Sequence, residues 1–90
     1  MVQVLAVRVA QETQDEAHIT YVRWYNTTTG EIGVATTAAM IEYFAKGSTA
    51  YACDGIVIKQ VVVRTLAGAQ FIGIEPQGGA LANLTRLPRF

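Results

Sequence analysis

The stretch at residues 56–65 constrains the fold more strongly than any other part of this 90-residue chain. Most of its positions hold Ile or Val, and only Lys59 and Gln60 interrupt its apolar interior. β-Branched residues favour strands. The two faces of this strand carry Ile56, Ile58 and Val62 on one side and Val57, Val61 and Val63 on the other. A strand that is apolar on both faces needs cover on both sides, from a helix, the tail, a curled sheet or a second subunit.

The rest of the chain supplies further strands, separated by turn signals. β-Branched and aromatic runs predict strands at residues 2–10, 18–25, 49–53 and 70–75, and residues 31–35 can add a short edge strand. The polar, acidic segment 11–17 is predicted to be a solvated turn. Asp54-Gly55 lies between two apolar runs, which indicates a β-hairpin. Pro76 ends the last strand because proline has no N–H to donate.

One helix is predicted at residues 37–46. Thr36 or Thr37 can accept hydrogen bonds from the first free amides, and Gly47 suits the left-handed position after the last turn. Met40, Ile41 and Phe44 share one face. In the tail, Leu81, Leu84 and Leu87 recur at a spacing of three, which predicts a short helical turn packed on the sheet.

These elements together predict a single α+β domain over residues 1–90. Its sheet is expected to be mostly antiparallel, with about five strands. The one main helix is expected between the second or third strand and the later ones, and the short helical turn at the C-terminal end.

The composition adds an expectation of self-association. Charged residues make up only 16% of the chain, whereas about 25% is typical, and hydrophobic residues make up 51%. A single ten-residue helix covers one face of such a sheet only in part. The uncovered apolar face, with Val57, Val61 and Val63, is therefore predicted to pair with a second subunit in a homodimer.

Charge and cysteine content argue against several classes of function. The net charge of zero favours neither nucleic acid nor an acidic membrane as a partner. Cys53 is the only cysteine, so neither an intrachain disulfide nor a cysteine-based metal cluster is expected. No cofactor or metal is predicted. Because the start lacks a basic signal-peptide region and no apolar run approaches about 20 residues, a cytoplasmic location is expected.

Catalytic residues are sparse. His18 follows the acidic turn that holds Asp15 and Glu16, so it could serve as a general base, but a histidine at a strand end that only binds its own turn is favoured. Ser48 and Cys53 show no arrangement that would make either a nucleophile. We therefore expect no enzyme activity.

Arginines beside aromatics provide the most specific candidate site. The candidate ligand or partner face consists of Arg8, Arg23, Trp24, Tyr25 and Arg64. Arginine next to aromatic rings can bind phosphates and stack on bases, so a nucleotide, a small anion or single-stranded nucleic acid is one interpretation. The other is that the arginines pair with glutamates and the aromatics belong to the core. A non-enzymatic, homo-oligomeric binding module is the favoured function, and nucleotide or single-stranded nucleic-acid binding is the alternative.

The order of short motifs resembles a family of small bacterial and phage proteins that is known only as a domain of unknown function. The matching segments are His18-Ile19-Thr20-Tyr21-Val22-Arg23, the helix that ends at Gly47, Tyr51, and Asn83-Leu84-Thr85-Arg86-Leu87-Pro88. The chain departs from the family at Phe71-Ile72-Gly73-Ile74 and at Ala82, where relatives tend to carry polar groups. The resemblance implies a similar fold and no activity.

Overall fold

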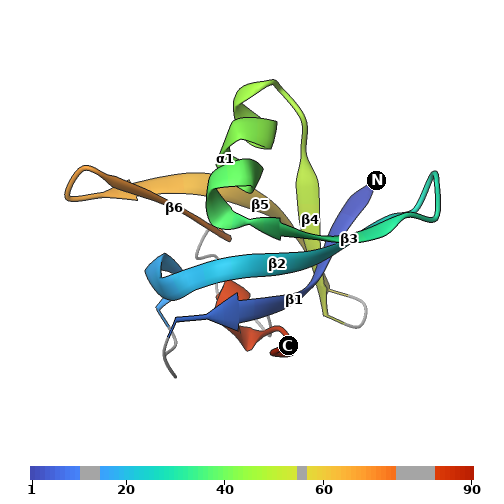
Figure 1. Cartoon of the computed structure of the whole chain (residues 1–90), viewed down its shortest axis with the longest axis horizontal. Helices are drawn as coiled ribbons and strands as arrows, with labels where there is room; N and C mark the ends of the chain where they lie inside the picture. Colours follow the sequence, from blue (N-terminus) through green and yellow to red (C-terminus); the bar gives the residue numbers. More distant parts are fainter. Residues whose placement is uncertain (11–14, 55–56, 75–82) are drawn as a thin grey trace.

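The computed structural model describes residues 1–10, 15–54, 57–74 and 83–90 (Figure 1). These residues form six strands, one α-helix and two short 3-10 turns. In chain order the elements are β1 (Val2–Val9), η1 (Glu16–His18), β2 (Ile19–Asn26), β3 (Ile32–Thr36), α1 (Thr37–Ala45), β4 (Ala50–Asp54), β5 (Val57–Leu66), β6 (Ala69–Ile74) and η2 (Leu84–Arg86).

All six strands belong to one sheet in the order β3-β2-β1-β4-β5-β6. Every neighbouring pair is antiparallel except β1 and β4, which are parallel. The α+β class and the mostly antiparallel sheet are confirmed. The sheet has six strands rather than about five, because residues 32–36 do form the additional edge strand.

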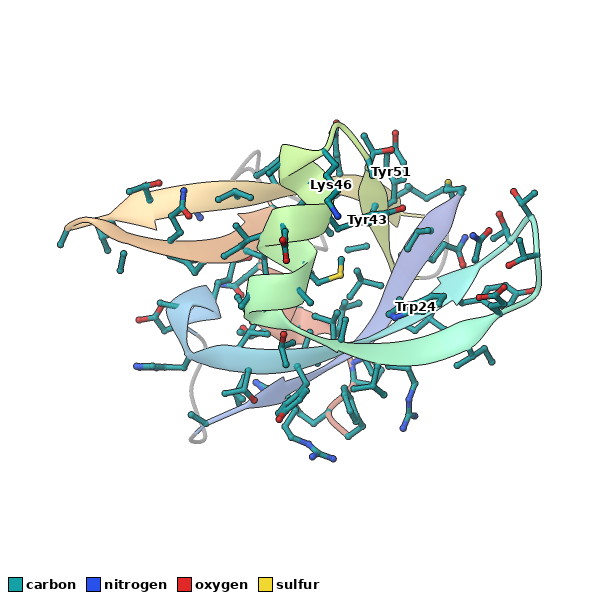
Figure 2. All side chains as sticks on the ribbon, turned by 45° about the horizontal axis from the view of Figure 1, so that its top comes forward. Trp24, Tyr43, Lys46 and Tyr51 are labelled. Carbon is teal, nitrogen blue, oxygen red and sulfur yellow. The ribbon has the colours of Figure 1, made fainter. Side chains whose placement is uncertain are left out.

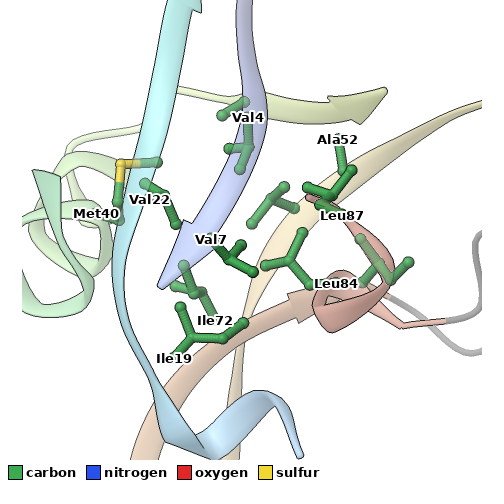
Figure 3. Packing of buried hydrophobic residues seen from close by; sticks show 12 residues of the cluster. Val4, Val7, Ile19, Val22, Met40, Ala52, Ile72, Leu84 and Leu87 are labelled. Atoms are coloured by element: carbon green, nitrogen blue, oxygen red, sulfur yellow. The ribbon is translucent and has the colours of Figure 1, made fainter. Parts of the chain in front are cut away.

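The sheet is curled. Helix α1 contacts β2 and β3 near one edge of the sheet and β5 and β6 at the other. Neighbouring strands lie about 4.8 Å apart, so the two edges of a flat six-stranded sheet would be too far apart for one helix of about 10 Å diameter. The curl encloses a core in which Met40 from α1 lies at one end and Leu84 and Leu87 from the tail lie at the other (Figure 3).

Helix α1 begins and ends where the local signals predict. The hydroxyl oxygen of Thr36 accepts a hydrogen bond from the Ala39 amide at 3.1 Å, which caps the first turn. Gly47 follows the helix with a φ of 91°, a left-handed conformation that favours glycine. Met40 is buried, and Ile41 and Phe44 pack against the core, so the predicted apolar face is confirmed.

Two hairpins join the strands of the second half, and the first is the one predicted near Asp54 and Gly55. Asp54, which was predicted to be a turn residue, is instead the last residue of β4 and pairs with Val57, and residues 55–56 lie outside the described part. Strands β5 and β6 are joined by Ala67 and Gly68, whose φ angles are 52° and 80°. Positive φ at both central positions is the requirement of a type I′ hairpin turn. Pro76 and Leu81 lie outside the described residues.

The tail completes the sheet where β4 leaves β1. Strand β4 pairs with β1 only at Gln3 and Val4. Further along β1, the Val7 amide donates to the carbonyl oxygen of Pro88 at 2.9 Å, and the Phe90 amide donates to that of Val7 at 3.2 Å. These hydrogen bonds fix the tail beside β1. Leu84 and Leu87 of the tail are buried in the core, as expected for the predicted short helical turn that packs on the sheet.

The curled sheet and the tail cover much of strand β5, which was predicted to need a second subunit to cover its apolar face. Val61 is only 2% exposed and belongs to the chain's own core, so it offers no surface to a second subunit. Val63 is partly buried, and the side chain of Val57 lies outside the described part. On the opposite face of β5, Ile58 is exposed. The predicted oligomer face at Val57, Val61 and Val63 is therefore wrong for Val61, because the curled sheet covers it. Among the described residues, no helix is long and apolar enough to cross a membrane.

Candidate binding surface

Strand alternation sorts the candidate residues onto two faces. Directly opposite residues of an antiparallel pair lie on the same face of the sheet. Arg8 is opposite Tyr21, Arg23 is opposite Val34, and Tyr25 is opposite Ile32. With Phe90 from the tail, these residues form one outer surface over β1, β2 and β3, which we call the aromatic–arginine face: Arg8, Tyr21, Arg23, Tyr25, Ile32, Val34 and Phe90.

Two arginines of this face contact the same aromatic ring. The guanidinium carbon of Arg8 lies 4.9 Å from the Phe90 ring centroid, and that of Arg23 lies 4.7 Å from it. Arg8 also lies 5.8 Å from the Tyr21 ring, and its Nε donates to the main-chain oxygen of Phe90 at 3.1 Å. Each exposed cation–π contact is worth about 0.5–1 kcal/mol. These contacts hold both side chains over the sheet.

Among the described residues, no Asp or Glu side chain neutralises the positive charges of this pair. Within the described residues, the ion pair that forms joins Arg64 to Glu16, and neither Arg8 nor Arg23 takes part in one. Both arginines are exposed. An anion or the acidic side chain of a partner therefore has access to two guanidinium groups that are already positioned.

Exposed apolar side chains continue the aromatic–arginine face to the sheet edge. Ile32 is 67% exposed and Val34 is 54% exposed, and both lie on the edge strand β3. Tyr21 on β2 is exposed beside them. Aromatic residues and arginine are enriched in the cores of protein interfaces, and lysine and acidic residues are depleted. This face has that composition.

Trp24 lies on the opposite face, towards the helix (Figure 2). A Cβ at Gly33 would come within 2.5 Å of its ring, so this glycine is what allows the indole to lie flat over β3. With Tyr43, Met40 and Asn26, among others, Trp24 lines a pocket of about 260 Å³ between α1 and the sheet. The prediction grouped Trp24 with Arg23, but consecutive residues of a strand point to opposite faces.

Arg64 is also separate from the other two arginines. Its Nη1 donates to the Oε1 of Glu16 at 3.1 Å, and its guanidinium lies 5.7 Å from the Phe71 ring. The Glu16 side chain is 4% exposed, although its segment was predicted to be a solvated turn. Its Oε2 accepts hydrogen bonds from the amides of Ile74 at 3.1 Å and Leu84 at 2.7 Å. Arg64 and Glu16 thus join η1, β5, β6 and η2, which gives the pair a structural role.

His18 and Cys53, the histidine and cysteine named above as possible catalytic groups, are not activated by their surroundings among the described residues. The Glu16 carboxylate binds Arg64 and two amides, and the His18 Nδ1 is buried with no hydrogen-bond partner among the described residues. Burial raises the pKa of the Cys53 thiol, so the reactive thiolate is scarce at neutral pH. Within the described part of the chain, His, Cys, Asp and Glu form no group of three or more that could hold a metal ion.

Comparisons with models of known protein families, with curated protein sequences and with solved structures found no significant match. The resemblance to the family of small bacterial and phage proteins therefore stays a prediction. Any functional conclusion has to come from the surface itself.

Proposed function

We propose that this chain is a non-enzymatic, homo-oligomeric interaction module that binds a protein partner through the aromatic–arginine face. The observation that carries the proposal is the juxtaposition of exposed Ile32 and Val34 with two arginines that pair with no Asp or Glu side chain among the described residues. Exposed apolar patches next to polar groups mark interaction sites in soluble proteins. The proposal retains the cytoplasmic location that the sequence predicts.

Capture of partners from a lysate of the source cells tests this proposal. The bait is the wild-type chain, compared with Arg23→Glu on the face and with Arg86→Glu as a control, since Arg86 is exposed on η2. We expect the recovery of a specific protein, measured by quantitative mass spectrometry, to fall at least about tenfold with Arg23→Glu, which corresponds to about 1.4 kcal/mol. Equal recovery by all three baits would contradict a role for this face.

Nucleotide or single-stranded nucleic-acid binding is the second candidate, and one observation favours it. The guanidinium groups of Arg8 and Arg23 both lie against the Phe90 ring, and that of Arg8 also lies against the exposed Tyr21 ring, so cations and aromatic rings are combined on one surface. Single-strand binding surfaces use this combination to neutralise phosphates and to stack bases.

Fluorescence anisotropy with a labelled oligothymidine at low salt tests the second candidate. If it is correct, the logarithm of the binding constant falls linearly with the logarithm of salt concentration. Arg23→Ala should then weaken binding and reduce the slope by about 0.7, the value for one phosphate contact on a single strand. Arg86→Ala should leave binding unchanged. An absence of binding at 20 mM salt eliminates this function.

A further inference from the structure

The open edge of β3 carries the strongest further inference. Strand β3 is at the end of the sheet order, and no described strand pairs with its outer side. The Asn26 amide donates to the carbonyl oxygen of Glu31 at 2.9 Å, so residue 31 turns its backbone groups towards β2. In an antiparallel ladder this orientation alternates from residue to residue. Residues 33 and 35 therefore also face β2, whereas Ile32, Val34 and Thr36 turn their N–H and C=O groups outwards.

An independent hydrogen bond between the ends of β2 and β1 gives the same assignment of which β3 residues turn their backbone groups outwards. The Thr27 amide donates to the Met1 carbonyl oxygen at 2.9 Å, and Gln3 is opposite Tyr25 in the same register. Alternation from residue 27 turns the backbone of Tyr25 towards β1. Its neighbour on β3, Ile32, consequently has no backbone partner on β2.

Within the part of the chain that the structure describes, this edge lacks the features that normally prevent strand addition. Natural edge strands are protected by charged side chains, proline, bulges or a covering element. The five residues Ile32-Gly33-Val34-Ala35-Thr36 contain neither a charge nor a proline, and their register with β2 has no shift. Two of them are the exposed Ile32 and Val34. The edge is therefore open to a strand of uncharged, β-branched composition.

We propose that the partner strand is β3 of a second copy of this chain, paired antiparallel about a two-fold axis at Val34. This inference rests on the homo-oligomeric part of the proposed function. The outward backbone groups of Ile32, Val34 and Thr36 match this arrangement, because it pairs Val34 with its own copy and Ile32 with Thr36 of the other. Each such pair can exchange two backbone hydrogen bonds.

The side chains that would meet across a two-fold axis at Val34 are compatible on both faces of the sheet. On the outer face, Val34 meets Val34 and Ile32 meets Thr36, which are favourable cross-strand pairs. On the helix side, Gly33 meets Ala35, and both are small. Arg23 is one strand further in, so the two copies of this arginine are about three strand spacings, or roughly 14 Å, apart, and their repulsion is largely screened. The pairing joins two aromatic–arginine faces into one continuous surface.

Sedimentation equilibrium and light scattering of the full chain test this dimer. Val34→Lys places like charges opposite one another across the axis, and Val34→Pro removes an outward N–H that β2 does not use. We expect both to raise the dimer dissociation constant at least about tenfold. Leu66→Lys is the matched control, because Leu66 is 69% exposed at the distant β5–β6 hairpin, and it should leave the dissociation constant unchanged. Circular dichroism checks that each variant is folded.

Three outcomes of this experiment distinguish the β3 contact from self-association in general. Loss of the dimer in both Val34 variants but not in Leu66→Lys supports pairing through β3. A wild-type dimer that persists in the folded Val34 variants overturns this edge contact, while the homo-oligomeric part of the proposed function stands. A wild-type monomer at several hundred micromolar overturns both, and leaves the partner-binding face to the capture experiment.

Discussion

Replacing Glu16 with alanine should lower the free energy of unfolding by about 3–5 kcal/mol. The substitution leaves the buried amides of Ile74 and Leu84 without an acceptor, and it removes the ion-pair partner of Arg64. Each unsatisfied buried donor costs about 1–3 kcal/mol. Because a small domain has a total stability of about 5–15 kcal/mol, this loss brings the protein close to unfolding.

Urea denaturation at low temperature measures this effect, and two further variants separate its causes. Arg64→Ala should cost only about 1 kcal/mol, because the arginine side chain is 40% exposed and the ion pair is screened. Glu42→Ala is the matched control: this glutamate is exposed on α1, so the change should stay within about 0.5 kcal/mol. If Arg64→Ala were as costly as Glu16→Ala, the ion pair rather than the backbone donors would dominate.

Local elements of this fold could be predicted because their signals are local. The helix is bounded by Thr36 and Gly47, whose capping roles depend only on the neighbouring turn. The strands follow from β-branched composition, and each lies within one or two residues of its predicted range. The hairpin between β4 and β5 was predicted from a turn dipeptide between two apolar runs, although Asp54 of that dipeptide belongs to β4. None of these inferences required knowledge of a distant segment.

The candidate site could be predicted only in part. Arg8, Arg23 and Tyr25 share one face, but Trp24 was predicted with them although alternation along β2 places it on the other face. Phe90 was missed, since its position depends on where β4 leaves β1 and the tail takes its place. Ile32 and Val34 belong to the aromatic–arginine face and are exposed because β3 lies at the edge of the sheet. That position depends on the order of the strands in the sheet.

The role of Glu16 could not be read from its surroundings in the sequence. Its neighbours are polar and acidic, which is typical of a solvated turn. Its partners Arg64, Ile74 and Leu84 lie 48, 58 and 68 residues away along the chain. A contact of this kind exists only after the sheet has curled and the tail has docked. The same non-local curl buries Val61, which composition alone places on an oligomer surface.

Replacing Gly73 with alanine should lower the free energy of unfolding by about 2–4 kcal/mol. A Cβ at this position would overlap the Oε1 atom of Glu16 and lie 2.7 Å from its Cδ. A flexible exposed glutamate would simply move aside. The Glu16 side chain cannot do so freely, because it is buried and accepts hydrogen bonds from Arg64 and from two amides. Accommodating the methyl group therefore breaks some of those hydrogen bonds.

A double-mutant cycle with Glu16→Ala decides whether this carboxylate is the reason for the glycine. In the Glu16→Ala background the methyl group has no carboxylate to displace, and alanine is favoured over glycine in a strand by about 0.5–1 kcal/mol. Gly73→Ala should then be neutral or stabilising by up to about 1 kcal/mol, which gives a coupling energy of about 2 kcal/mol or more in urea denaturation. Additive effects of the two substitutions would show that the cost of Gly73→Ala comes from the strand backbone. The Glu16 side chain would then be free to adjust, contrary to its buried, fully hydrogen-bonded environment.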